Sequence, residues 1–540
     1  MIQEKLVSYF DNSIRENWNK TALRDYDNGE ISYAKTGNTI LKLHDVLRRS
    51  GIVEGDKIAV IGKNSANWAC VYIAAVSYGA VIVPLLQDFT AKEVYNLVNH
   101  SESKLLFASD FIFNKLNLQE FTLLKSIYQL DNFELLFDAD QKSIRFNNAL
   151  PEVSQADFAL HIPENSLLAA ILYTSGTSGN PKGVMLAHNA LAANIRYARA
   201  NMPLQPGDRI VSFLPLAHSY GCAFEFLYPF SIGCTITFLG RLPAPNIVVK
   251  AFNEIKPRLI LSVPLVIEKV YKTKIKPKLS KPGIKLMLKI PGLRQIVYRK
   301  IRAGLSASFG NEFMEVVIGG AKLNREVEIF LRKINFNFSI GYGMTECGPL
   351  ITYDGWKTTR TFSAGKVIDC LEMKIDSDNP SKRVGEILLR GENVMLGYYK
   401  NKDETEKTFT EDGWMKTGDL GLIDEDGYLY IKGRSKSMIL GASGKNIYPE
   451  EVEAKLQNLP LVSECIVVGR QNQIVAMVYP DHAIIEERAL NKEQLETIFS
   501  NYQKLVNKDL PGYMQIQKIV LREEEFEKTP KKSIKRYLYE

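Results

Sequence analysis

Paired cysteines are absent from this sequence. The 540-residue chain has six cysteines, and they are scattered along it: Cys70, Cys222, Cys234, Cys347, Cys370 and Cys465. No two of them form a CxxC pair or any spacing typical of a zinc site. We therefore expect the cysteines to be reduced, which favours a cytoplasmic location.

The sequence also lacks an apolar signal core near its first residue, which reads MIQEKLVSYFDNSIREN, so export is not expected. The longest uncharged stretch, residues 64–87, is long enough to cross a bilayer. Asparagine, serine, glycine and proline interrupt it and divide it into a helix-like half and the strand-like VIVPLL. This pattern predicts a buried helix followed by a buried strand.

The charge balance gives no strong indication of a nucleic-acid partner, because 68 basic residues against 61 acidic ones leave a net charge of only +7. The distribution of these charges along the sequence is more informative. Residues 269–302 contain twelve Lys or Arg and no Asp or Glu, interleaved with apolar residues. Two interpretations stay open: a solvated helical face, or a surface for anionic lipid headgroups at the inner membrane face, where each basic residue contributes on the order of 1 kcal/mol.

The length predicts two or more domains. From about residue 55, short apolar runs alternate with longer amphipathic ones, as in DKIAVIG, NWACVYIAAVSYG and AVIVPLL, and a similar stretch follows from residue 167. Such alternation indicates an α/β fold with parallel strands and helical crossovers, here two doubly wound lobes. After about residue 360 the chain changes to short strands and turns, typical of a small β-rich unit. We predict a large N-terminal domain over 1–435 and a small α+β domain over 436–540, joined by a hinge.

Residues 173–183 read YTSGTSGNPKG and follow a strand-like run. In such a turn, main-chain amides and hydroxyls can converge on phosphate oxygens while a lysine adds positive charge. The loop matches neither GxxxxGK[ST] nor GxGxxG, and a flexible surface loop is the alternative interpretation. The candidate phosphate contacts are Thr174, Ser175, Gly176, Thr177 and Lys182.

This loop resembles the signature of the adenylate-forming superfamily, which includes acyl-CoA synthetases, firefly luciferase and the adenylation domains of peptide synthetases. Further matching motifs follow in the expected order over nearly the whole chain. They are FLPLAHSYG (213–221), GGAKL (319–323), GYGMTE (341–346), GEILLRG (385–391), TGDLG (417–421), GRSKSMI (433–439) and GKNIYPEEVE (444–453).

The resemblance implies an acid–thiol ligase that uses ATP and Mg²⁺ to convert a carboxylic acid into acyl-AMP, releases pyrophosphate, and transfers the acyl group to coenzyme A. PLAHSYG and the basic segment 269–302 are similar to long-chain members, so a fatty acid is the expected substrate. Transfer to a carrier-protein phosphopantetheine and an aryl acid substrate are alternatives. A non-catalytic acyl-nucleotide-binding protein and a simple NTPase are further alternatives.

The resemblance also implies roles for single residues in ATP and metal binding. Gly320 and Ala321 would present backbone to the adenine edge, and Tyr342, between Gly341 and Gly343, would offer it a flat surface. The other implied contacts are Thr345 at the α-phosphate, Glu346 and Thr174 at the magnesium ion, and Asp419 and Arg434 at the ribose. One carboxylate is a sufficient protein contribution, because Mg²⁺ usually keeps water and substrate phosphate among its ligands.

His218 is similar to the residue that lines the acyl pocket in this superfamily, although a packing role would also explain it. Lys436 matches the hinge residue, and Gly444 matches a glycine that admits the pantetheine arm. The tail departs from the pattern: TPKKSIKRYLY (529–539) places Ser533 where the catalytic lysine is expected. Of the neighbouring Lys531, Lys532 and Lys535, we favour Lys532, because a long side chain can reach the site from an adjacent position.

Overall fold

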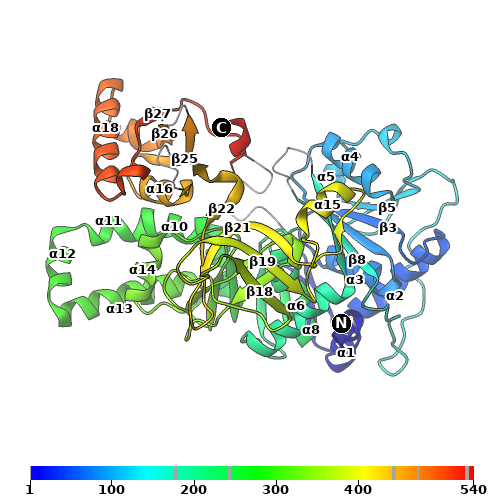
Figure 1. Ribbon diagram of the computed structural model, residues 1–540. Coiled ribbons are helices and arrows are strands. Elements are labelled where there is room, and N and C mark those ends of the chain that lie inside the picture. Colours follow the sequence, from blue (N-terminus) through cyan, green and yellow to red (C-terminus); the bar gives the residue numbers. More distant parts are fainter. Residues whose placement is uncertain are drawn as a thin grey trace.

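The computed structural model describes residues 2–174, 181–240, 245–440, 446–470, 473–528 and 534–539. It confirms a mixed α/β fold with a large N-terminal part of several sheets and a smaller C-terminal part (Figure 1). In the described part of the chain, no helix is both long and apolar enough to cross a membrane.

An eight-stranded sheet forms the first half of the large part. Its strand order is β20-β9-β8-β4-β3-β5-β6-β7. Central neighbours are parallel, as the alternating pattern predicts, whereas β9, β20 and β7 run antiparallel to theirs. The strands are β3 (Lys57–Ile61), β4 (Val81–Leu85), β5 (Ser103–Ala108), β6 (Ser126–Gln129), β7 (Leu135–Asp138), β8 (Leu168–Thr174), β9 (Lys182–Ala187) and β20 (Gly397–Tyr398); helices α2 (Tyr33–Arg49), α3 (Ala66–Tyr78), α4 (Ala91–Ser101) and α5 (Asp110–Phe113) belong to the same region.

The uncharged stretch 64–87 forms the predicted helix and strand, α3 and β4. Ser65 caps α3 by accepting a hydrogen bond from the backbone N–H of Trp68, and Gly79 ends the helix in the left-handed region with φ of 86°. Almost every side chain of α3 is buried, and all of β4 is buried. Burial in the protein core therefore explains the apolar character of this stretch.

Two smaller sheets follow in the large part. The first has the order β10-β11-β1-β2, so the amino-terminal strand β1 pairs in parallel with β11, more than 200 residues later. The second is the parallel sheet β12-β13-β14. Their elements are α1 (Leu6–Glu16), β1 (Thr21–Asp25), β2 (Gly29–Ser32), α6 (His188–Asn201), β10 (Arg209–Ser212), α7 (Ser219–Gly221), a π-helix (Cys222–Leu227), α8 (Tyr228–Ile232), β11 (Thr235–Phe238), α9 (Pro245–Ile255), β12 (Leu259–Ser262), β13 (Glu315–Ile318), α14 (Arg325–Lys333) and β14 (Phe338–Ile340).

The β-rich unit predicted after residue 360 is present as antiparallel sheets. One has the order β15-β16-β17 and the other β18-β19-β21-β22. The elements are β15 (Tyr342–Gly343), β16 (Leu350–Tyr353), β17 (Lys366–Val367), β18 (Leu371–Asp376), β19 (Gly385–Gly391), α15 (Lys402–Thr408), β21 (Met415–Ile423) and β22 (Leu429–Arg434).

The C-terminal part contains a three-stranded sheet with its own apolar core. Its helix α18 (Lys492–Lys508) begins with a capping box of Asn491 and Gln494. The other elements are β23 (Ile439–Leu440), β24 (Asn446–Ile447), α16 (Pro449–Leu456), β25 (Val462–Arg470), β26 (Gln473–Pro480), α17 (His482–Glu487) and β27 (Lys518–Leu521). The side-chain amide of Asn324, at the start of α14, donates to Asn458 at 2.7 Å and joins this part to the large one.

Candidate active site

Parallel strands bring the GGAKL and GYGMTE motifs together. β13 and β14 are neighbours, so the segments that follow them lie at the same edge of the sheet. The N–H of Gly341 donates to the carbonyl of Ile318 at 3.0 Å. Gly320 has φ of +83°, a conformation that glycine adopts without strain, and both Gly320 and Ala321 are exposed. The edge therefore presents open backbone, as a contact to a flat base requires.

A polar cluster around the buried Asp419 forms beside this edge from Tyr342, Asp419 and Arg434. The Tyr342 hydroxyl donates to Asp419 Oδ2 at 2.6 Å, and Arg434 Nε lies 3.0 Å from Asp419 Oδ1. Asp419 is only 4% exposed. Burial and the neighbouring carboxylate raise the pKa of Tyr342 well above its usual value, and the Asp419 carboxylate raises the pKa of Arg434. Both partners therefore stay protonated at neutral pH and donate to the Asp419 carboxylate.

Strand pairing explains why Asp419 and Arg434 meet. They are register partners in the antiparallel pair of β21 and β22. The Asp419 N–H donates to the hydroxyl of Thr417 at 3.1 Å, and the N–H of Gly418 donates to Glu386 on β19 at 2.9 Å. TGDLG thus forms a strand irregularity. Its hydrogen bonds fix the backbone at Gly418 and Asp419, and this positions the Asp419 carboxylate.

A second cluster connects Glu346 with the candidate phosphate loop. Glu346 lies in a short 3₁₀ turn, Thr345–Cys347, and accepts a hydrogen bond from the Tyr398 hydroxyl at 2.9 Å. The ammonium group of Lys182 lies 4.9 Å from the centre of the Tyr398 ring and forms an ion pair with Glu404. The hydrogen bond from Lys182 lowers the pKa of Glu404 to about 2.

Lys182 and Thr174 are register partners at the loop end of the β8–β9 hairpin. Ser175, Gly176 and Thr177 lie between them in sequence, outside the described residues. The hairpin therefore places two predicted phosphate contacts side by side, while Tyr398 connects Lys182 to the candidate metal residue Glu346.

The FLPLAHSYG segment is held by two side chains distant from it in sequence. Glu225 in the π-helix, 1% exposed, accepts hydrogen bonds from the N–H groups of Phe213 and Leu214, both at 2.9 Å. Asn64 donates to the carbonyl of Leu214 at 2.7 Å. Burial raises the pKa of Glu225 well above its usual value. These contacts fix the backbone just before His218.

The same segment reaches the β13 edge through Tyr220, whose hydroxyl donates to the carbonyl of Val317 at 3.1 Å. His218 caps α7 by accepting from the N–H of Tyr220 at 3.3 Å and is partly exposed. A local capping role is thus visible for His218, and the acyl-pocket role stays a prediction. Thr345 is buried within its turn.

Lys436 lies in the 3₁₀ turn Ser435–Ser437, directly after the strand that ends at Arg434. The hydroxyl of Ser435 donates to the carbonyl of Gly418 at 3.1 Å, so the turn is attached to the Asp419 loop. Gly444 and Lys532 lie outside the described residues. Lys535, one of the alternative tail lysines, lies 3.5 Å from Glu527 within the C-terminal part.

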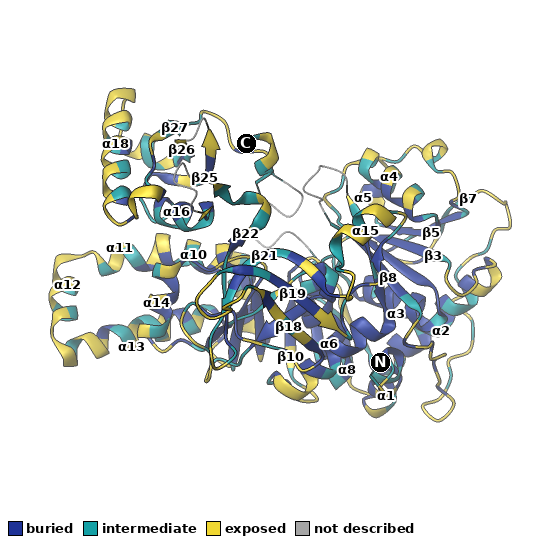
Figure 2. Ribbon diagram, in the orientation of Figure 1, coloured by how far each residue is buried: buried dark blue, intermediate teal, exposed yellow. Residues whose placement is uncertain are grey.

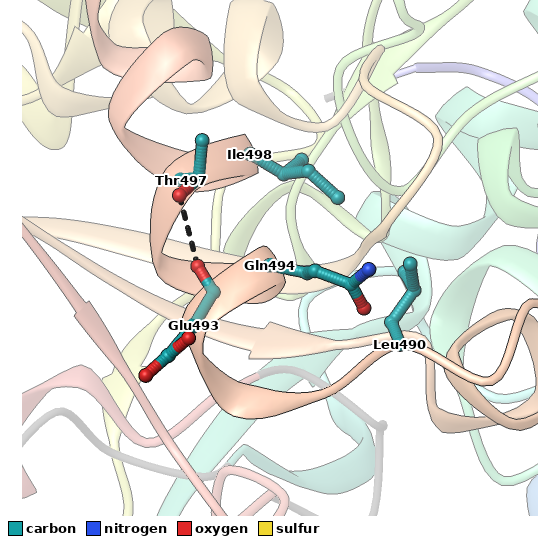
Figure 3. A pocket seen from close by; sticks show the side chains of 5 residues that line it. All are labelled: Leu490, Glu493, Gln494, Thr497 and Ile498. Carbon is teal, nitrogen blue, oxygen red and sulfur yellow. Dashed lines mark hydrogen bonds between the residues drawn. The ribbon is translucent and has the colours of Figure 1, made fainter.

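A hollow elsewhere on the molecule is separate from these clusters. Its lining side chains come from α18 and the residues just before it (Figure 3): Leu490, Glu493, Gln494, Thr497 and Ile498. None of them belongs to a motif singled out in the sequence, and the hollow contains no cation to neutralise phosphate. The candidate active site is therefore the edge formed by the Asp419 and Glu346 clusters.

The magnesium ion implied by the sequence suits this donor set. Glu346 supplies a carboxylate and Thr174 a hydroxyl, which are oxygen ligands of the kind Mg²⁺ prefers. Among the residues that the structure describes, no group of three or more His, Cys, Asp or Glu side chains could hold a metal without a substrate. A single carboxylate fits an ion whose other ligands come from nucleotide phosphate and water.

Comparisons with known proteins agree with this geometry. Residues 10–399 match the AMP-binding enzyme family, and residues 436–540 match the AMP-binding enzyme C-terminal domain. The long-chain-fatty-acid–CoA ligase FadD15 of Mycobacterium bovis is 30% identical over 472 residues, which cover 82% of this chain and 75% of the relative.

Solved structures show the same fold at lower identity. The anthranilate CoA ligase AuaEII in complex with anthranoyl-AMP has a TM-score of 0.79 at 20% identity, covering 99% of this chain and 96% of that one. The O-succinylbenzoate coenzyme A synthetase MenE of Bacillus subtilis, in complex with ATP and a magnesium ion, has a TM-score of 0.77 at 21% identity, covering 98% of both chains.

The chain belongs to the AMP-binding enzyme family, because that family matches well over half of its length. The prediction of an acid–thiol ligase is confirmed at the level of enzyme class. Four participants in the site were missed in the sequence: Tyr398, Glu404, Glu225 and Asn64. The one local signal was Glu225, a single acid in the apolar run CAFEFL, where a buried charge needs partners.

Replacing Tyr342 by Phe tests the Asp419 cluster. The change removes one donor to a buried carboxylate while keeping the ring, and a hydrogen bond to a charged group is worth about 1.5–3 kcal/mol. We expect the KM for ATP to rise about 10-fold or more, measured by pyrophosphate release. Tyr353→Phe is the matched control, because its hydroxyl donates to the buried Glu315 at 2.9 Å, at the opposite end of β13. Equal effects of the two variants would contradict a role of the cluster in nucleotide binding.

Proposed function

We propose that this chain activates a fatty acid with ATP to give acyl-AMP and pyrophosphate, and then transfers the acyl group to coenzyme A. The observation that carries the proposal is the meeting of six motifs, far apart in sequence, around two polar clusters at one edge: the phosphate loop, FLPLAHSYG, GGAKL, GYGMTE, TGDLG and GRSKSMI. The similarity to a long-chain-fatty-acid–CoA ligase supports the choice of acid. The neighbours that bind aryl acids are about 20% identical and support the fold alone.

The described residues suit the nucleotide half of the first step. We propose that adenine lies against Gly320, Ala321 and the Tyr342 segment, where backbone is open. Asp419 would accept hydrogen bonds from the ribose hydroxyls, because its carboxylate is rigidly held by Tyr342 and Arg434. Arg434, half exposed beside it, would add positive charge on the phosphate side.

The triphosphate would follow the β8–β9 hairpin. Lys182 is positioned there by Glu404 and the Tyr398 ring, and Thr174 lies opposite it. Magnesium, when bound, would neutralise charge on the phosphates beside Glu346 and Thr174. The protein needs no nucleophile of its own, since attack by the substrate carboxylate on the α-phosphorus depends on alignment and charge neutralisation.

For the second step, we propose that residues 436–540 rotate about Lys436 and bring Gly444 to the thiol. In the described part of the chain, polar side chains attach the C-terminal part in its present arrangement. Besides the Asn324–Asn458 contact, their contacts include hydrogen bonds from Lys276 to the carbonyl of Asn458 at 3.3 Å and from Lys272 to that of Val462 at 3.5 Å. Contacts of this kind can exchange without breaking an apolar core.

One assay tests the proposed function. The purified chain is incubated with ATP, magnesium, coenzyme A and a panel of acids, and AMP is followed together with thioester mass. We expect AMP and acyl-CoA in equal amounts with fatty acids, and neither product when magnesium is chelated. If only aryl thioesters formed, the substrate would be an aryl acid and not a fatty acid. If a carrier protein became acylated and no acyl-CoA formed, the acyl acceptor would be the carrier protein. ATP binding without AMP formation would indicate a binding protein. Phosphate release that does not depend on the acid would indicate an NTPase.

Lys436→Pro tests the hinge. Proline fixes φ and removes an N–H, so rotation at this position is blocked. We expect thioester formation to fall at least about 100-fold while pyrophosphate release stays within about 2-fold, assuming a barrier increase of about 3 kcal/mol. Lys436→Ala, which removes only the side chain, serves as control. Equal loss of both half-reactions in the proline variant would contradict the hinge role of Lys436.

Alanine substitutions at Lys531, Lys532 and Lys535 identify the tail lysine. We expect Lys532→Ala to lower pyrophosphate release by about 100-fold, the lower end of the effect of losing one preorganised charge contact. Lys535→Ala should have little effect, because this side chain already faces Glu527. If all three variants release pyrophosphate like the unmodified chain, the tail lysine is not part of the mechanism.

A further inference from the structure

The basic segment 269–302 forms a helical arm at one side of the molecule (Figure 1). The arm begins at the end of α10 (Pro264–Val270) with a π-helix (Tyr271–Ile275). It then runs through α11 (Lys276–Leu279), α12 (Pro282–Lys289) and α13 (Pro291–Ser308). Both α12 and α13 begin with proline at the first helical turn, and Pro291 ensures that α12 and α13 are separate helices.

The base of the arm is anchored. The Tyr271 hydroxyl donates to Glu326 on α14 at 2.8 Å, and Lys276 lies 3.0 Å from the same carboxylate. Near its other end, Arg302 donates to Asn337 at 3.1 Å, and Val297 and Leu305 are buried. These contacts hold the arm in a defined orientation without involving α12.

The outer part of the arm is apolar and uncovered. α12 has no buried residue, and Figure 2 shows it as exposed at the edge of the molecule. Leu286 is 63% exposed, Ile290 47% and Ile296 45%. Neighbouring exposed apolar side chains on an anchored element are typical of an interaction surface.

Positive charge surrounds these apolar residues. Lys285 and Lys289 lie one helical turn apart on α12, next to Leu286. No Asp or Glu occurs between residues 269 and 311. In the part of the chain that the structure describes, no hydrogen bond or ion pair involves the ammonium groups of Lys281, Lys285 or Lys289. The other exposed basic residues of the outer arm are Lys278, Arg294, Arg299 and Lys300.

We propose that α12 and the first half of α13 form a docking surface for an anionic lipid bilayer. Leu286, Ile290 and Ile296 enter the interfacial region while the lysines contact phosphate headgroups. An acidic protein would be drawn to the same charge. The bilayer is the better occupant because the exposed apolar residues lie among lysines on a short helix and its connection, which suits a layer where headgroups meet acyl chains. Such docking keeps the enzyme at the phase in which a fatty acid dissolves.

Vesicle co-sedimentation of the full chain tests the proposal. Binding is measured without ATP, acid or coenzyme A, so its outcome does not depend on the proposed function. The vesicles contain phosphatidylglycerol and phosphatidylcholine in equal parts, or phosphatidylcholine alone. We expect binding to the first and little to the second. We also expect K281E/K285E/K289E to reduce binding by at least about 100-fold, and L286S/I290S/I296S by about 10-fold.

The matched control is K382E/K402E/K504E, which reverses three exposed charges outside the arm. It should bind anionic vesicles like the unmodified chain, and all variants should keep the same unfolding temperature. Binding that is absent, or equal in the arm variant and the control, overturns the proposal. The proposal is also overturned if K281E/K285E/K289E keeps vesicle binding but loses association with an acidic carrier protein, because the surface would then dock a protein.

Discussion

The buried carboxylate of Asp419 is the constraint on which the candidate active site depends. A carboxylate removed from water must be neutralised and hydrogen-bonded, and an uncompensated one would cost several kcal/mol. Tyr342 and Arg434 meet this requirement, and each comes from a different element. Satisfying one charge therefore joins β15, which directly follows the parallel strand β14, to the β21–β22 pair. Arg434 is two residues before Lys436, so the proposed hinge begins at the point where this constraint ends.

The second cluster is held differently, and the difference suits its proposed role. Lys182, Glu404 and Tyr398 interact through an ion pair and a ring contact near the surface rather than through a deeply buried carboxylate. Because the pKa of Glu404 is about 2, this carboxylate stays ionised at neutral pH and keeps Lys182 in position when no phosphate is present. A triphosphate at the hairpin would share Lys182 with Glu404, so the site can exchange partners without unfolding.

Local elements were predictable where the chain carries its own signals. The interrupted stretch 64–87 indicated a buried helix and strand, because caps and breakers mark their ends. Which sheet each strand joins was not predictable from such local signals. The strand at 168–174, expected to open a second lobe, joins the first sheet beside β4, and β1 pairs with β11. Strand pairing over such distances depends on packing of the whole core, which no local pattern records.

The sequence by itself determined the family and the candidate residues, because the motifs are contiguous strings whose residue types must lie next to one another to bind a nucleotide. Only the tertiary structure decided which other side chains hold them. Glu225, Asn64, Tyr398 and Glu404 occur as single residues, and their roles arise from contacts across long separations. The basic segment shows the same division: its charge was readable in the chain, whereas which part is anchored and which faces solvent depended on where α14 lies.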